Sequence, residues 1–180
     1  MLKLSELNMM MARGSALLEE HDPETLFQVA SKGRTYVEIG THWGGSAIVA
    51  GLAGCEVHCI DPWESTGNLL ARPGWGAVQL NWKHAGLDPR KLFIHKQKHP
   101  PWPEAIKYQN FEIGLIDGDH AEESVRLDWE AMKIHITKYV LFHDVVAYVD
   151  VQKVYREAAQ EWEVWEGPYM SQFGVVRRIQ

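Results

Sequence analysis

Cysteine is scarce in this sequence: only Cys55 and Cys59 occur among its 180 residues. If both lie on one strand, the four-residue spacing separates them by about 13 Å, which is too far for a disulfide bond. His58 lies between them but would point to the opposite face of that strand, which argues against a zinc site. We therefore interpret both cysteines as small core residues and expect a cytoplasmic protein, since that compartment is reducing.

Long apolar runs and an excess of basic residues are also absent. No run approaches the roughly 20 residues of a membrane-spanning helix, and the N-terminal sequence lacks the pattern of a signal peptide. The 18 Lys and Arg residues stand against 24 Asp and Glu, which gives a formal net charge of −6. Because nucleic-acid binding depends on clustered Lys and Arg, we expect no nucleic acid and no membrane as partner, and a small-molecule substrate instead.

Repeats and low-complexity tracts are missing as well, so the chain is analysed as one domain with an extension. Residues 1–33 are expected to form an N-terminal helical extension packed on the main domain, residues 34–180. One helix is expected over Leu2–Leu18, and a second starts with Asp22 as its N-cap and Pro23 in the first helical position. These short helices, rich in Met and Leu, are a candidate homodimer contact.

From residue 34 onward, strands and helices alternate, which predicts an α/β fold with helices on both faces of a sheet. The last two strands are joined by a loop alone, which favours an antiparallel pair. We predict a Rossmann-like three-layer sandwich with a seven-stranded, mostly parallel sheet and one antiparallel strand near the edge. The expected strands are Thr35–Ile39, Glu56–Ile60, Lys91–His95, Glu112–Ile116, Tyr139–Phe142, Trp162–Trp165 and Val175–Ile179, and the expected helices are Ser46–Ala53, Gly76–His84, Glu122–His135 and Val151–Glu161.

A glycine turn follows the first expected strand. The apolar run ends at Glu38, and a helix is expected to begin at Ser46. Gly40 and Gly44 would let the backbone come close to a ligand, and the start of the helix offers free N–H groups. The next apolar run ends at Asp61, which is well placed to bind a pair of ribose hydroxyls. This pattern predicts a nucleoside cofactor.

Acids and histidines also follow the fourth and fifth expected strands. Asp117 ends one apolar run, and His143 and Asp144 follow the other. Because the carboxyl ends of parallel strands meet at one edge of a sheet, these side chains could hold magnesium, manganese or iron together. Without a metal, the same groups would bind substrate hydroxyls directly.

Two residues after Asp117 have competing interpretations. Asp119 and Glu122 have the spacing of a capping box, so Asp119 either caps the next helix or contacts a ligand. His120 falls in the first turn of that helix, where the helix dipole disfavours the imidazolium form. A neutral ring there could accept a proton.

These motifs resemble those of class I S-adenosylmethionine-dependent methyltransferases. Within that class the chain resembles a small subfamily, methyltransferase 24-like, that has an Asp-Gly-Asp-His motif after the fourth strand and a His-Asp pair after the fifth. The resemblance covers about residues 34–180. The segments that carry it are Glu38–Ser46, Cys59–Trp63, Ile116–His120 and Phe142–Val145.

The resemblance implies a binding site for S-adenosylmethionine. Gly40 and Gly44 would line the methionine part of the cofactor, with Glu38 beneath the turn. Asp61 would bind the ribose hydroxyls, and Trp63 would lie against the adenosine. The implied site is completed by Thr41, His42, Trp43, Ser46, Gln97 and Asp117.

The resemblance further implies an enzyme, with O-methylation of a small hydroxylated acceptor, a sugar or an aromatic compound, as the expected reaction. Metal-dependent O-methyltransferases carry their ligands at related positions, which supports Asp117, His143 and Asp144 as ligands of Mg or Mn. Asp117 would lie near the reactive methyl group. His120 or His143 would take the proton of the acceptor, with His120 favoured.

Two other classes of function are alternatives to a methyltransferase. A nicotinamide-dependent oxidoreductase would require G-x-G-x-x-G after the first strand, but His42 occupies the position of the second glycine. A catalytically inactive domain that binds a nucleoside cofactor and acts as a partner subunit has no need of the polar residues at the fourth and fifth strand ends. Turnover of the methyl donor would discriminate this alternative from an enzyme.

Overall fold

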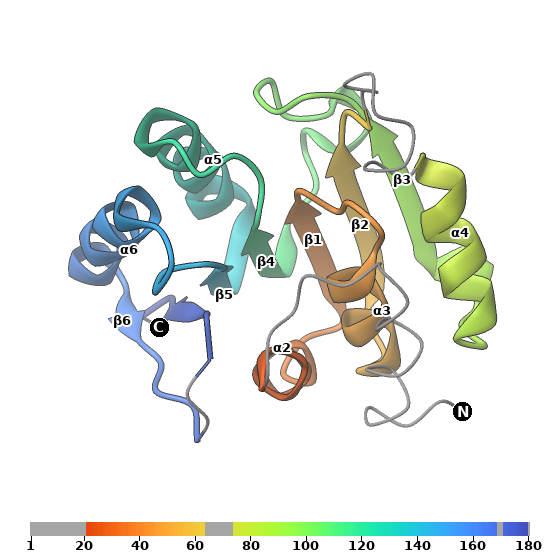
Figure 1. Cartoon of the computed structure of the whole chain (residues 1–180), viewed down its shortest axis with the longest axis horizontal. Helices are drawn as coiled ribbons and strands as arrows, with labels where there is room; N and C mark the ends of the chain where they lie inside the picture. Colours follow the sequence, from red (N-terminus) through yellow and green to blue (C-terminus); the bar gives the residue numbers. More distant parts are fainter. Residues whose placement is uncertain (1–20, 64–73, 169–170, 180) are drawn as a thin grey trace.

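The computed structural model describes residues 21–63, 74–168 and 171–179 (Figure 1). Its centre is a seven-stranded sheet in which β1 to β5 run parallel and β7 runs antiparallel to both of its neighbours. The prediction of a mostly parallel sheet with one reversed strand near the edge is therefore confirmed. The strand order across the sheet is β3 (Leu92–Lys96), β2 (Glu56–Asp61), β1 (Thr35–Ile39), β4 (Phe111–Ile116), β5 (Ile136–Phe142), β7 (Gly174–Arg177) and β6 (Glu163–Val164).

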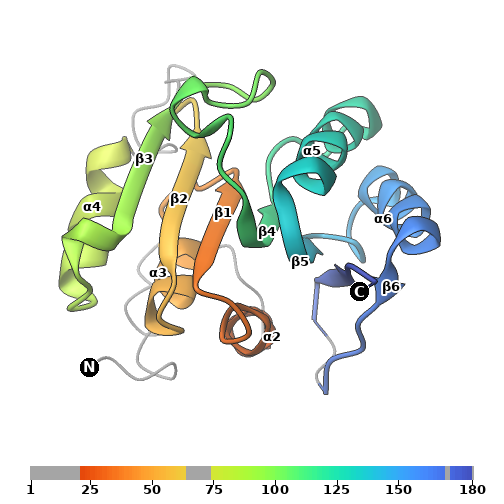
Figure 2. The ribbon, with the colours of Figure 1, turned by 180° about the vertical axis from the view of Figure 1, so that it is seen from behind.

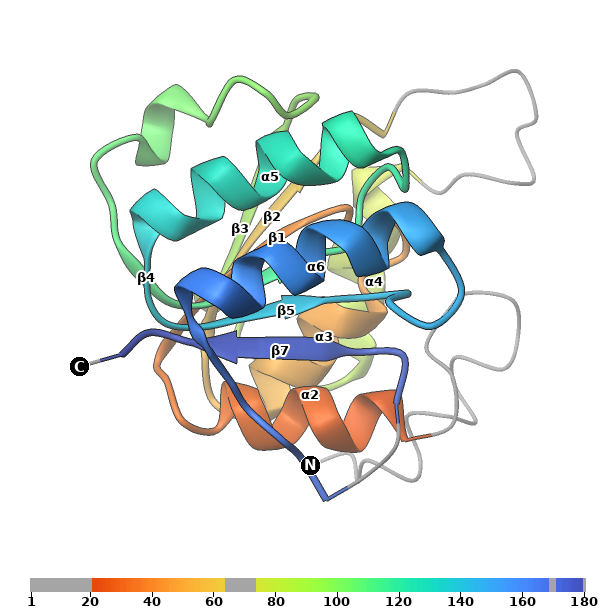
Figure 3. The ribbon, with the colours of Figure 1, turned by 90° about the vertical axis from the view of Figure 1, so that its left-hand side faces the viewer.

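Helices cover both faces of the sheet and complete three layers (Figures 1 and 3). One face carries α2 (Asp22–Ala30), α3 (Gly45–Leu52) and α4 (Trp75–His84), and the other carries α5 (Glu122–His135) and α6 (Val149–Glu161). Short 3₁₀ turns at Pro89–Lys91 and Glu104–Ile106 flank β3, and the view from behind shows the long connection from β3 to β4 (Figure 2). Among the described residues, no helix is both long and apolar enough to cross a membrane.

Two hydrophobic clusters, one on each face, follow from the alternation of side chains along the strands. In β1, Tyr36 packs with the α2–α3–α4 side, whereas Val37 and Ile39 pack with the α5–α6 side. Cys55 and Cys59 are both buried in the first cluster and carry free thiols, as predicted.

The start of α2 differs from the prediction. The helix includes Asp22, and His21 with a φ of 72° is its N-cap, without a side-chain capping bond. The Asp22 carboxylate is fully buried and points into the fold, where it accepts hydrogen bonds from the Gln172 N–H and pairs with His143. The predicted capping role of Asp22 is therefore wrong, because a distant partner binds the carboxylate.

Other boundaries differ by a few residues. The largest change is in β5, which begins at Ile136 directly after α5, because Ile136 pairs with Phe111 of β4. The predicted helix over Leu2–Leu18 lies outside the described residues, as does most of the segment between β2 and α4, and the homodimer contact predicted through that helix and α2 stays a prediction. The division into an extension and a main domain stays a prediction, although α2 buries Leu26 and Val29 in the first hydrophobic cluster.

Candidate active site

The sheet order places a ligand crevice at the carboxyl end of β1. The chain passes from β1 to β2 and β3 on one side and returns to β4 and β5 on the other. The segments after β1 and β4 therefore lead to helices on opposite faces of the sheet, α3 and α5, and ligands of open α/β sheets bind at such a switch point. Most of the site residues described below come from the carboxyl ends of β1, β2, β4 and β5 and from the loops after them, and the others come from helices and from the loop after β3.

Backbone strain concentrates at these strand ends. Among the described residues, four non-glycine residues have a positive φ, and His42, Trp63 and Asp144 are three of them, with φ of 49°, 43° and 61°. They follow β1, β2 and β5 respectively. Strained conformations of this kind persist where the surrounding structure holds them, and they cluster at functional sites.

The turn after β1 needs glycine. Gly40 has a φ of 92°, and a Cβ atom built on it would lie 1.9 Å from the carbonyl oxygen of Asp117. The Gly40 N–H donates to the carbonyl of Ile60, and the Asp117 N–H donates to that of Ile39. The backbones after β1 and β4 are therefore packed together with no room for a side chain.

Glu38 anchors this turn from below. It is fully buried, and its Oε2 accepts hydrogen bonds from Tyr36 Oη at 2.8 Å and Ser46 Oγ at 2.7 Å. Burial raises the pKa of Glu38 to about 7, although its hydrogen bonds oppose the shift. Glu38 Oε1 and Thr41 Oγ1 are buried without a hydrogen bond of good geometry in the described part of the chain. The Thr41 hydroxyl nevertheless lies beside Glu38 and lowers the pKa of its carboxyl, so the two buried groups are neighbours beneath the turn.

Asp61 ties the loops after β1 and β2 together. Its Oδ2 accepts the His42 N–H at 2.9 Å, and its Oδ1 accepts the Trp63 N–H at 2.7 Å. Trp63 Nε1 donates to the His42 carbonyl at 3.0 Å, and only 8% of Trp63 is exposed. Each Asp61 oxygen keeps a further lone pair for a ligand.

Two further residues predicted to bind the cofactor, Trp43 and Gln97, make contacts with other parts of the chain. The Trp43 carbonyl accepts a hydrogen bond from Asn81 Nδ2 of α4. Gln97, just after β3, donates its side-chain amide to the Pro101 carbonyl at 2.6 Å. The Gln97 amide nitrogen is therefore already bound within its own loop.

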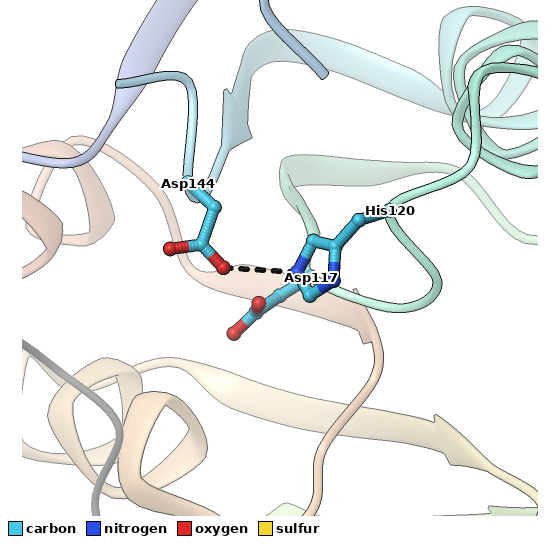
Figure 4. A group of neighbouring side chains, drawn as sticks. All are labelled: Asp117, His120 and Asp144. Atoms are coloured by element: carbon cyan, nitrogen blue, oxygen red, sulfur yellow. Dashed lines mark hydrogen bonds and ion pairs between the residues drawn. The ribbon is translucent and has the colours of Figure 1, made fainter. Parts of the chain in front are cut away.

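Asp117, His120 and Asp144 come together after β4 and β5 (Figure 4). One ligand atom from each lies within 4.8 Å of the other two, and all three residues are partly exposed. His120 Nε2 lies 2.9 Å from Asp144 Oδ2 (Figure 4). Burial raises the pKa of Asp117, whereas the neighbouring His143 imidazole lowers that of Asp144.

His143 lies behind this group and does not join it. It is buried, with Nε2 at 3.0 Å from Asp22 Oδ2 and Nδ1 at 3.2 Å from Asp117 Oδ1 and 3.3 Å from Asp144 Oδ2. Although burial lowers the pKa of His143, the three carboxylates raise it to about 12. An imidazolium has no lone pair for a metal or a proton. The ligand atoms that converge in the described part of the chain include one from His120 and none from His143, so His143 as a metal ligand stays a prediction.

Ala121 is the N-cap of α5 and has no side-chain capping bond, so Asp119 lies ahead of the cap and does not fill the predicted capping role. Its Oδ1 accepts the Ala121 N–H at 3.3 Å, and its Oδ2 accepts the Ser124 hydroxyl at 2.9 Å, at the start of α5. The reciprocal bond of a capping box is not formed, because Glu122 binds Arg126 and Lys153 instead.

Three contacts at the site are not predicted by any pattern in the sequence. Asp22 binds His143 across 121 residues of chain. His99 Nδ1 pairs with the buried Asp128 Oδ1 at 2.7 Å, and Asp128 Oδ2 would lie 3.4 Å from a Cβ atom on Gly118. The Tyr148 ring stacks on His120, with ring centres 4.0 Å apart and planes 4° from parallel.

Comparison with known proteins yields one family match. A family model described as a methyltransferase domain matches residues 37–145, which is more than half of the chain. The match includes the glycine turn, Asp61 and the group of Asp117, His120 and Asp144. No curated protein matches the sequence.

Solved structures share the fold at low identity. An O-methyltransferase from Bacillus cereus, solved with SAH, is 15% identical with a TM-score of 0.68, and the match covers 98% of this chain and 90% of that one. A putative caffeoyl-CoA O-methyltransferase from Staphylococcus aureus is 11% identical with a TM-score of 0.73, covering 98% and 92%. The O-methyltransferase TomG from Streptomyces achromogenes, involved in tomaymycin synthesis and solved with SAM, is 15% identical with a TM-score of 0.61, covering 98% and 88%.

Proposed function

We propose that this chain, which belongs to the methyltransferase-domain family and is a class I S-adenosylmethionine-dependent methyltransferase, methylates a hydroxyl group of a small acceptor. The observation that carries the proposal is the group of Asp117, His120 and Asp144 directly beside the glycine turn. A hydroxyl is a weak nucleophile, and this group supplies the means to activate it next to the cofactor turn.

The turn after β1 has the features that S-adenosylmethionine requires. Gly40 carries no side chain between the backbones that end β1 and β4, and the buried Glu38 places a carboxylate beneath the turn, where it would face the positively charged methionine part of the cofactor. Asp61 would bind the ribose hydroxyls with its free lone pairs. The presence of SAH or SAM in two of the similar solved structures supports this assignment.

We propose that Asp117, His120 and Asp144 hold a divalent ion, Mg or Mn. Two carboxylates and one imidazole suit these ions, and their ligand atoms already converge. The ion would lower the pKa of the acceptor hydroxyl. The charged His143 would offset part of the negative charge of the carboxylates, and its bond to Asp22 would hold it in place.

The alternative mode uses the same residues without an ion. His120, oriented by its hydrogen bond to Asp144, would then take the hydroxyl proton itself. The two modes make opposite predictions about chelators, so one experiment separates them.

We expect chelator-treated protein to lose most of its turnover and to regain it with Mg or Mn. The release of S-adenosylhomocysteine from S-adenosylmethionine would be measured by mass spectrometry with a panel of hydroxylated sugars and aromatic compounds. Loss of several kcal/mol of charge stabilisation corresponds to a decrease of roughly 10²-fold or more in rate. Turnover that EDTA leaves unchanged would support the metal-free mode. No turnover with any acceptor, together with intact cofactor binding, would favour the inactive partner subunit.

A further inference from the structure

Asp22 is a buried carboxylate that reaches the candidate active site from outside the segment that matches the methyltransferase family. It is the first residue of α2 and is fully buried, whereas the family match begins only at residue 37. Moving a carboxylate out of water is costly unless charged or hydrogen-bonding partners replace the water. An acid at this position therefore has to be stabilised by the groups that face it.

Two segments from distant parts of the chain face the Asp22 carboxylate. Its Oδ1 accepts the N–H of Gln172 at 2.8 Å, and its Oδ2 lies 3.0 Å from Nε2 of His143. The Gln172 carbonyl in turn accepts the N–H of Val145, two residues after His143, at 3.0 Å. These contacts form a closed loop, so they fix the start of α2, the segment before β7 and the segment after β5 relative to one another.

His143 connects Asp22 with the candidate metal group. Its Nδ1 lies 3.2 Å from Oδ1 of Asp117 and 3.3 Å from Oδ2 of Asp144. The same Asp144 oxygen lies 2.9 Å from Nε2 of His120. Because two neighbouring carboxylates repel each other, an imidazole ring that faces both of them influences how closely they approach. The position of the His143 ring, and with it the position of Asp22, therefore bears on the geometry of the whole group.

We propose that Asp22 is a positioning residue for methyl transfer, which fixes the two carboxylates of the candidate metal group through His143 and does not contact the acceptor itself. This inference rests on the proposed function, because it names the residue that holds the group to which hydroxyl activation is assigned. Residues that orient such a group from behind usually contribute about 10–100-fold to metal affinity or activity. Helix α2 is thereby part of the active site, although the family match does not include it.

The test replaces Asp22 by Asn, which has nearly the same shape. The Oδ1 of Asn can still accept the Gln172 N–H, so this contact of α2 is kept, whereas an uncharged amide then faces His143. The matched control is Thr25→Val. Thr25 lies in the same helix and is 3% exposed, and its hydroxyl has no hydrogen bond in the described part of the chain.

Asp22→Asn is expected to lower kcat about 10–100-fold with the sugar and aromatic acceptors of the panel. The KM for S-adenosylmethionine should change little, because Asp22 does not contact the glycine turn or Asp61 in the structure. Thr25→Val should keep the kcat of the wild type. Release of S-adenosylhomocysteine would be measured by mass spectrometry for all variants.

A second readout needs neither an acceptor nor a metal. The imidazole NMR signals of His120, identified by their absence in His120→Ala, are recorded on chelator-treated protein. They should shift in Asp22→Asn and stay in place in Thr25→Val, because Asp144 faces both His143 and His120. A purely structural role of Asp22 would lower the Tm without moving these signals in the folded protein.

Combination with His143→Gln tests whether Asp22 acts through His143. If it does, the double variant should be no slower than the slower single variant, whereas independent residues would give the product of the two losses. Such a product, an unchanged kcat or unmoved His120 signals in Asp22→Asn would overturn the inference. Asp22→Ser is the second variant, and failure of both Asp22 variants to fold would assign this residue to stability and also overturn it.

The wild type separates this inference from the proposed function. Wild-type turnover with an unaffected Asp22→Asn variant rejects the positioning role alone. No wild-type turnover with any acceptor of the panel rejects the proposed function, and the positioning role with it.

Discussion

Replacement of His120 by Ala, or of Asp144 by Asn, is expected to lower kcat/KM for methyl transfer by about 10²–10⁴-fold, the usual contribution of a positioned group that activates a hydroxyl. His120 and Asp144 contact each other at 2.9 Å and both belong to the candidate metal group. Asn is chosen at position 144 because Asp144 has a φ of 61°, a conformation that Asn tolerates well. The affinity for S-adenosylmethionine should change little, since neither side chain contacts the glycine turn or Asp61 in the structure.

The matched control is His84→Ala, which removes an exposed imidazole at the end of α4. Steady-state kinetics and calorimetric cofactor binding would be measured on all three variants. If His120→Ala and Asp144→Asn kept the kcat/KM of His84→Ala, the polar group would have no part in the reaction. If they lost cofactor binding and melted early, their effect would be structural and the catalytic assignment would fail.

Replacement of Gly40 by Ala adds one methyl group. We expect it to destabilise the fold more than a methyl group added at any other described glycine. The added Cβ would lie 1.9 Å from the carbonyl oxygen of Asp117, and the φ of 92° strains any L side chain. Neither backbone can move without breaking the bonds that join β1, β2 and β4 at this point. We expect a loss of roughly 3 kcal/mol or more in the free energy of unfolding, or a decrease in Tm of about 6–12 °C, with loss of cofactor binding.

Gly54→Ala is the control for backbone strain alone. Gly54 has a φ of 101°, but nothing lies within 4 Å of a Cβ atom built there. This variant should cost only about 1–2 kcal/mol and keep full cofactor affinity, because Gly54 is remote from the crevice. Chemical denaturation and calorimetry would compare the two variants. Equal stability and equal cofactor affinity would contradict the close contact between the two strand ends.

Local patterns were sufficient to predict the fold. The helix Glu122–His135 was predicted with both ends correct, because Val125, Trp129 and Met132 recur at helical spacing and all three are buried. The strand Thr35–Ile39 was also predicted correctly, since a short apolar run between turn residues is typical of a buried parallel strand. The start of β5 was missed because Ile136 follows the helix without a turn residue, and only its pairing with Phe111 defines it.

In the candidate site, the position of the carboxylates at the strand ends follows from local patterns, whereas the tertiary contacts around them do not. Asp117 directly follows one apolar run and Asp144 lies two residues after another, and parallel strands bring such ends together. The choice between His120 and His143 depended on Asp22, which approaches His143 from a helix 121 residues away. A tertiary contact of this kind leaves no periodic or spacing signal in the sequence. The stack of Tyr148 on His120 was missed for the same reason.

The most direct measurement is a calorimetric titration of chelator-treated protein with S-adenosylmethionine, repeated with added Mg or Mn. We expect one bound cofactor per chain, with a dissociation constant within the range of about 1 µM to 1 mM that is typical of enzyme KM values. We also expect heat from the added metal that disappears in Asp144→Asn. No binding of S-adenosylmethionine under either condition would contradict the assignment of the glycine turn, Glu38 and Asp61 as a cofactor site.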